Sequence, residues 1–163
     1  MSETTTKEAV LAALASYAAG KTGAPPAIAG AIASHFLAVT TARSLALVGG
    51  DASVQSLLAH RTWFDPRDIR CTSGSVAAAV GGRQVPLAEA LASDIVCVHE
   101  SISIAANQLR RGTHVNALAA VTIDDELRSV ATIVDEASGL PKLAAGIVDG
   151  RQLDEITIFV AAH

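Results

Sequence analysis

Two short segments contain the residue types from which chemistry could be built: His99-Glu100-Ser101 and Gly49-Gly50-Asp51. His99 and Glu100 directly follow an apolar run, and an imidazole beside a carboxylate can act as general acid and base near neutral pH. We therefore take His99, Glu100 and Ser101 as candidate catalytic residues, with solvated loop residues as the alternative. His99 and Ser101 are not read as parts of a triad, because side chains two apart in a turn need not face each other.

The Gly-Gly-Asp turn lies between the apolar run 44–48, which predicts a buried strand, and a helix-like stretch over 51–61. A strand, a glycine turn and a helix open a dinucleotide-binding fold, in which backbone N–H groups at the helix N-terminus bind the pyrophosphate. The usual spacing is Gly-x-Gly-x-x-Gly or Ala, and here Asp51 replaces the second glycine and Val54 the third. Asp51 either caps the helix or contacts a ligand, and its charge lies where a pyrophosphate would.

Strands alternate with helices along the rest of the chain, which predicts a parallel sheet. We expect α/β class: a Rossmann-like, doubly wound, mostly parallel sheet in a single domain, with an N-terminal helical segment. Residues 1–24 form that helix and a linker, and residues 25–163 form the Rossmann-like domain. The expected strands are 44–48, 68–72, 84–85, 94–98, 114–119, 131–135 and 155–160, and the expected helices are 6–19, 26–39, 51–61, 73–82, 86–92, 105–110, 124–129 and 140–146.

Composition excludes several classes of function. The net charge of −4 is spread without runs, and no basic patch indicates nucleic acid. The longest apolar segment, 27–39, is too short to span a bilayer, and the N-terminus lacks the pattern of a signal peptide, so we expect a cytoplasmic protein without membrane contact. Cys71 and Cys97 lie in apolar runs without metal-ligand spacing, so we expect two buried thiols and no metal site.

Five segments, in order along the chain, resemble the cofactor domain of the ornithine cyclodeaminase/μ-crystallin family. They are Thr-Ala-Arg-Ser-Leu-Ala-Leu-Val-Gly (41–49), Ser-Asp-Ile-Val (93–96), Leu-Arg-Arg-Gly-Thr-His-Val-Asn-Ala (109–117), Ile-Val-Asp (133–135) and Asp-Glu-Ile-Thr-Ile-Phe (154–159). The resemblance implies NAD(P)-dependent redox chemistry at an amino-bearing carbon. It also implies a structural role for His114. The strand ends and this resemblance together place the former dinucleotide pocket at Gly49, Gly50, Asp51, Ser53, Asn116 and Leu118.

Four departures from that family lead us to expect a truncated, degenerate member. The residues before Pro25 are too few for the family's substrate-binding half, and the family's Arg-Thr falls on Pro25-Pro26. The family's acidic residue falls on Val121, and the glycine loop carries Asp51. As part of that same fourth departure, the second strand ends in Cys-Thr-Ser-Gly-Ser (71–75), without a carboxylate for a ribose hydroxyl or a cation for a 2′-phosphate.

Three functions follow, of which we expect the first, and the other two are its alternatives. The first is a cofactor-independent enzyme of cyclase, isomerase or lyase type, which acts on a small molecule through His99 and Glu100 at the former nicotinamide pocket. The second is an NAD(P)-dependent imine or amino-acid oxidoreductase, or a cyclodeaminase-like enzyme. The third is a non-catalytic binding or partner subunit. Because the helices over 6–39 are rich in alanine, we also expect a homodimer, or a contact with a partner subunit, through them.

Overall fold

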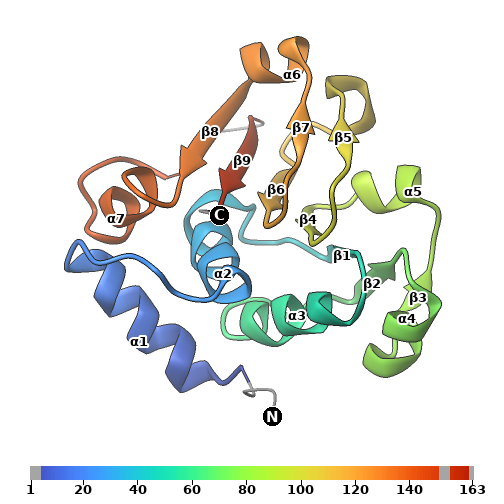
Figure 1. Ribbon diagram of the computed structural model, residues 1–163, viewed down its shortest axis with the longest axis horizontal. Helices are drawn as coiled ribbons and strands as arrows, with labels where there is room; N and C mark the ends of the chain where they lie inside the picture. The colour runs from blue at the N-terminus through green and yellow to red at the C-terminus, as the bar shows by residue number, and fades with distance from the viewer. Residues whose placement is uncertain (1–4, 151–154, 162–163) are drawn as a thin grey trace.

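The computed structural model describes residues 5–150 and 155–161 and has a seven-stranded parallel sheet at its centre (Figure 1). The strand order is β3-β2-β1-β4-β6-β9-β8. The strands are β1 (Ser44–Val48), β2 (Asp68–Cys71), β3 (Arg83–Gln84), β4 (Ile95–Val98), β6 (His114–Ala117), β8 (Ala131–Asp135) and β9 (Ile156–Val160). The chain moves outward from β1 through β2 to β3, and then from β4 through β6 to β8 on the other side, with the last strand, β9, inserted between β6 and β8. The predicted doubly wound α/β fold is therefore confirmed, with its switch point between β1 and β4.

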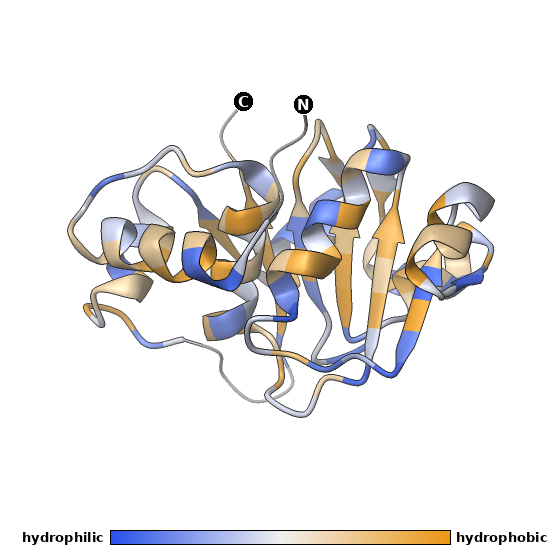
Figure 2. Ribbon diagram, turned by 90° about the horizontal axis from the view of Figure 1, so that it is seen from below, coloured by the Kyte–Doolittle hydropathy of each residue, from blue (hydrophilic) through white to orange (hydrophobic). Residues whose placement is uncertain are grey.

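Helices cover both faces of the sheet. One face packs against α2 (Pro26–Leu37), α3 (Val54–His60), α4 (Gly74–Val80) and α7 (Gly139–Ala144), and α1 (Lys7–Ala18) lies on α2 and α7. The other face packs against α5 (Leu87–Leu91), the turn η2 (Ala106–Gln108), α6 (Asp125–Val130) and a small parallel pair, β5 (Ser103–Ile104) with β7 (Thr122–Ile123). The central strands are mainly apolar (Figure 2), because a strand between two layers of helices is buried on both sides.

The N-terminal helices belong to the same packed body. Thr6 caps α1 by accepting a hydrogen bond from the Ala9 N–H, and the Tyr17 hydroxyl near the end of α1 donates to Glu136 Oε2 at 2.9 Å. Pro26 opens α2 at a position where a missing N–H costs nothing. Nine of the twelve residues of α2 are buried, so this alanine-rich helix lies between α1, α3 and the sheet.

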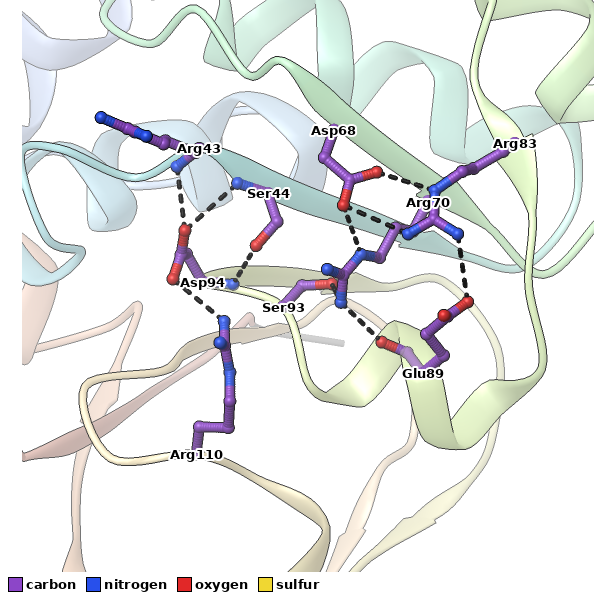
Figure 3. A network of polar contacts seen from close by, with 9 residues as sticks. All are labelled: Arg43, Ser44, Asp68, Arg70, Arg83, Glu89, Ser93, Asp94 and Arg110. Carbon is purple, nitrogen blue, oxygen red and sulfur yellow. Dashed lines mark hydrogen bonds and ion pairs between the residues drawn. The ribbon is translucent and has the colours of Figure 1, made fainter.

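The amino-terminal edge of the sheet is tied together by charged side chains (Figure 3). The Asp94 carboxylate accepts hydrogen bonds from the backbone N–H groups of Arg43 and Ser44, at 2.9 and 3.1 Å, and pairs with Arg110. Asp68 pairs with both Arg70 and Arg83 at 2.9 Å. These charged groups form hydrogen bonds and ion pairs with one another. In doubly wound sheets, ligands bind at the opposite end, outside the carboxyl ends of the strands.

Candidate functional site

The turn after β1 brings the backbone to the switch point of the sheet. Gly49 has φ +132°, a conformation that side chains rarely adopt, and its N–H donates to Thr72 Oγ1 at 3.2 Å. A Cβ placed on Gly49 would lie 3.1 Å from the His99 Cβ, so the turns after β1 and β4 touch here. Gly50 is exposed, and a Cβ there would meet no atom within 4 Å. A ligand can therefore approach the backbone at Gly50.

The residues that follow the turn have different roles from those expected. A 3₁₀ turn, η1 (Asp51–Ser53), precedes α3 in place of one regular helix over 51–61. Gly50 occupies the position before η1, and the Asp51 side chain makes no capping hydrogen bond, so the prediction of Asp51 as a helix cap is wrong. The Ser53 side chain is buried and its hydroxyl donates to the Gly50 carbonyl at 2.7 Å. This hydroxyl closes the turn, and Asp51 stays exposed beside it.

A hollow of about 460 Å³ lies at the carboxyl ends of β2, β3 and β4, beside the glycine turn. Its polar lining consists of Thr72, Gln84 and Glu100, and its apolar lining consists of Val85, Pro86 and Leu87. Because Gly49 bonds to Thr72, the hollow and the turn after β1 share a wall. Neither Gln84 on β3 nor Leu87 at the start of α5 was selected from the sequence.

The three candidate catalytic side chains do not meet in one place. The His99 imidazole Nε2 lies 2.6 Å from the Ser56 hydroxyl of α3. Glu100 is exposed and lines the hollow beside β2 and β3, whereas Ser101 lines a separate hollow with Ile102 and Thr122. Burial lowers the pKa of His99 to about 4, so the imidazole is neutral at physiological pH. His99 and Glu100 are thus neighbours in sequence whose side chains have different surroundings.

His99 adjoins a buried polar array between the sheet and α2. His60 Nδ1 lies 2.7 Å from the Ser56 carbonyl and therefore donates to it, so His60 Nε2 accepts from the Ser34 hydroxyl at 2.8 Å. Ser34 in turn accepts from the Asn116 amide at 2.9 Å. The array continues because Asn116 Oδ1 lies 2.7 Å from His114 Nε2, and His114 Nδ1 lies 2.7 Å from the Thr157 hydroxyl. Sequence reasoning missed Ser34, Ser56 and His60 as members of this array, because they come from different helices.

Neutral imidazoles are required by this array. Desolvation by burial lowers the pKa of His60 to about 4 and that of His114 to about 3. His114 and Asn116 lie two residues apart on β6, so their side chains face the same side of the sheet. Thr157 on β9 is the register partner of His114 and faces that side as well. The expected structural use of His114 agrees with this position, and Asn116 faces the core as well.

Two further cofactor-pocket candidates, Asn116 and Leu118, contact α2. A Cβ on Gly30 of α2 would lie 3.2 Å from the Asn116 Cγ and 3.3 Å from a Leu118 methyl group. Gly30 therefore lets α2 approach the sheet closely, and both side chains are buried beneath that helix. Of the six candidate cofactor residues, only Gly50 and Asp51 have side-chain positions that are exposed.

Asp135 and the two cysteines have local structural roles. The Asp135 carboxylate accepts hydrogen bonds from the backbone N–H groups of Ser138 and Gly139, so it caps the segment after β8. Cys71 and Cys97 are free and buried, as expected. Among residues 5–150 and 155–161, no group of histidine, cysteine and acidic side chains could hold a metal ion. In the same part of the chain, no helix has both the length and the apolar character to cross a membrane.

The sheet topology and the glycine turn at its switch point define a doubly wound, Rossmann-like α/β protein. Neither a protein-family model nor a curated protein sequence matches the chain. Several solved structures, in contrast, match its fold. An archaeal alanine dehydrogenase dimer with bound NAD has a TM-score of 0.72 at 20% identity, over 84% of this chain and 57% of that chain.

Two other structures have the same architecture. The iminosuccinate reductase of Paracoccus denitrificans, in complex with NAD⁺, has a TM-score of 0.72 at 20% identity and covers 85% of this chain. A probable ornithine cyclodeaminase from Bordetella pertussis Tohama I has a TM-score of 0.69 at 22% identity and covers 84%. The chain spans less than 60% of the length of each of these proteins. The resemblance found in the sequence is thus confirmed for the fold.

Proposed function

We propose that this chain binds a nicotinamide adenine dinucleotide and serves an NAD(P)-dependent reaction at an amine- or imine-bearing carbon. The observation that carries the proposal is the open hollow beside the Gly49–Gly50 turn, at the switch point of a doubly wound sheet. Such a crevice, outside the carboxyl ends of the strands, is where these sheets bind nucleotides. This is the second of the functions considered from the sequence.

The residues of the hollow suit the adenosine half of the cofactor. Val85, Pro86 and Leu87 offer an apolar surface for a purine, while Thr72, Gln84 and Glu100 offer hydrogen-bonding groups for its ribose. The open space over Gly50 lets phosphates approach the backbone. A bound nicotinamide would supply the hydride acceptor or donor.

The class of substrate is proposed from the structural likenesses alone. These structures are an alanine dehydrogenase, an iminosuccinate reductase and a probable ornithine cyclodeaminase. The matched region is a part of each of those proteins. We propose that groups which bind the substrate lie outside the region matched here.

The test is a titration of the purified protein with NADH and NADPH, followed by cofactor fluorescence and by thermal shift. We expect saturable binding at micromolar concentrations, together with a rise in melting temperature. Gly50→Val should abolish binding while leaving the melting temperature of the free protein unchanged, because the added side chain occupies open space. Absence of saturation by either nucleotide at millimolar concentrations would overturn the proposal.

Asp51 favours a second candidate function, the cofactor-independent enzyme. Its exposed carboxylate lies beside the position of the pyrophosphate and opposes binding of a dinucleotide. In that case turnover of a small molecule should be lost in both His99→Asn and Glu100→Gln. Because the two side chains have different surroundings, loss in only one variant would argue against joint acid–base catalysis.

A further inference from the structure

The end of β2 offers no charged group for recognition of a ribose. Thr72 and Ser73 follow the strand, and the Thr72 hydroxyl accepts from the Gly49 N–H at 3.2 Å. The Ser73 hydroxyl lies 3.0 Å from that of Ser75 and so has a local partner. In dinucleotide-binding folds a carboxylate near this point binds the ribose 2′-hydroxyl of NAD, and an arginine accommodates the 2′-phosphate of NADP. The group that reads the 2′ position must therefore come from another strand.

Glu100, which follows β4, is the charged residue that lines the hollow. It faces the same space as Thr72 and Gln84 and is exposed. No hydrogen bond or ion pair of Glu100 is found within the described part of the chain, so the carboxylate is available to a ligand.

The surrounding residues leave Glu100 without a compensating cation. Gln84 supplies a neutral amide, which lies against the start of α4, where a Cβ on Gly74 would be 3.0 Å from its Oε1. Arg83 is the adjacent basic residue in sequence, and its guanidinium pairs with Asp68 at 2.9 Å and with Glu89 at 3.4 Å. Among residues 5–150 and 155–161, no lysine or arginine lines the hollow.

We infer that Glu100 selects NAD(H) over NADP(H) at this site. This inference rests on the proposed function and names the form of the cofactor that the site takes. The Glu100 carboxylate accepts a hydrogen bond from an adenosine ribose hydroxyl, and it repels a 2′-phosphate. A phosphate carries close to two negative charges at neutral pH, so we expect a preference of about tenfold or more at low ionic strength, weakening as salt is added.

The experiment compares dissociation constants for NADH and NADPH in the unmodified chain and in three variants, by cofactor fluorescence. Glu100→Gln keeps the size of the side chain and should bring the NADH preference to less than about threefold. Glu100→Lys should reverse the preference. Glu126→Gln removes an equally exposed carboxylate from α6, which precedes β8 at the other edge of the sheet, and should leave both constants unchanged. Competition by 5′-AMP and by 2′,5′-ADP provides the same comparison without the nicotinamide half.

The outcomes separate this inference from the proposed function. If the unmodified chain binds neither nucleotide, the proposed function fails and the inference fails with it. If it binds NADPH as tightly as NADH, or if Glu100→Gln retains the full preference, the inference is overturned while nucleotide binding stands. Thermal melts of each variant check that the fold is intact.

Discussion

Asp51 is the residue whose charge most directly opposes the proposed function. Its carboxylate is exposed at the start of η1, where other dinucleotide-binding turns have glycine. The Asp51 side chain makes no capping hydrogen bond, so its replacement does not lower stability through the loss of a helix cap. We expect Asp51→Asn to tighten NADH binding by about fivefold at low ionic strength, since repulsion between exposed charges a few ångströms apart is worth roughly 1 kcal/mol.

The control for this variant is Asp125→Asn, which removes an exposed carboxylate from the first turn of α6. Titration of both variants with NADH at two salt concentrations distinguishes a local effect from one of net charge. Equal tightening in the two variants, or none in Asp51→Asn, would show that Asp51 does not oppose the cofactor.

Individual site residues were harder to predict from the sequence than the strands that position them. His99, Glu100 and Ser101 are consecutive, yet their side chains have three different surroundings. His99 contacts Ser56, whereas Glu100 and Ser101 line two separate hollows. A strand end fixes where a residue lies, but the packing of neighbouring helices decides which way its side chain turns. The direction of a side chain in a turn is therefore not encoded in spacing alone.

The elements themselves could be predicted well, because their patterns are long enough to read. The bounds of β1 and β8 agree with the expected strands, and the other long elements differ by a few residues at their ends. The pair β5 and β7 was missed, since two-residue strands show no alternation. The start of α3 was also misjudged, because Gly50 and the Ser53 hydroxyl together favour a 3₁₀ turn before the helix.

The glycine turn provides a matched pair of substitutions on one element. Gly49→Ala should lower the free energy of unfolding by about 1–3 kcal/mol, because φ is +132° and the added methyl group crowds His99. Gly50→Ala should change the free energy of unfolding by less than about 0.5 kcal/mol, since the methyl group meets open space. Urea unfolding of both variants measures the difference. Similar destabilisation by the two substitutions would contradict the geometry of the turn.

At the scale of the molecule, self-association through the helices over 6–39 stays a prediction. It was based on apolar surface that the alanine-rich helix was expected to leave open, and most of α2 is covered within the chain. Of the large apolar side chains on α1 and α2, Leu11 is exposed. The alanine dehydrogenase to which the fold is similar is described as a dimer.

The buried polar array makes the stability of the whole molecule sensitive to acid. His60, His99 and His114 have folded-state pKa values of about 4, 4 and 3, below the ordinary value of 6.5, because burial disfavours their charged forms. The unfolded chain binds protons at these positions below about pH 6.5, while the folded chain does not until about pH 4. Stability from the neutral imidazoles is therefore complete above about pH 6.5 and is lost progressively as the pH falls towards 4.

This loss can be measured by urea unfolding between pH 7 and pH 4.5. Near pH 5, the three histidines should together bind about three protons from the solvent when the chain unfolds. Replacing His60 by Gln removes one titrating group and should lower the proton uptake by about one, even though the loss of its bonds to Ser34 and Ser56 destabilises the protein at every pH. His35 provides the control, because it is exposed and stacked on Trp63, so His35→Gln should change the uptake less. Proton uptake that does not fall in His60→Gln would show that this imidazole is not held neutral in the folded state.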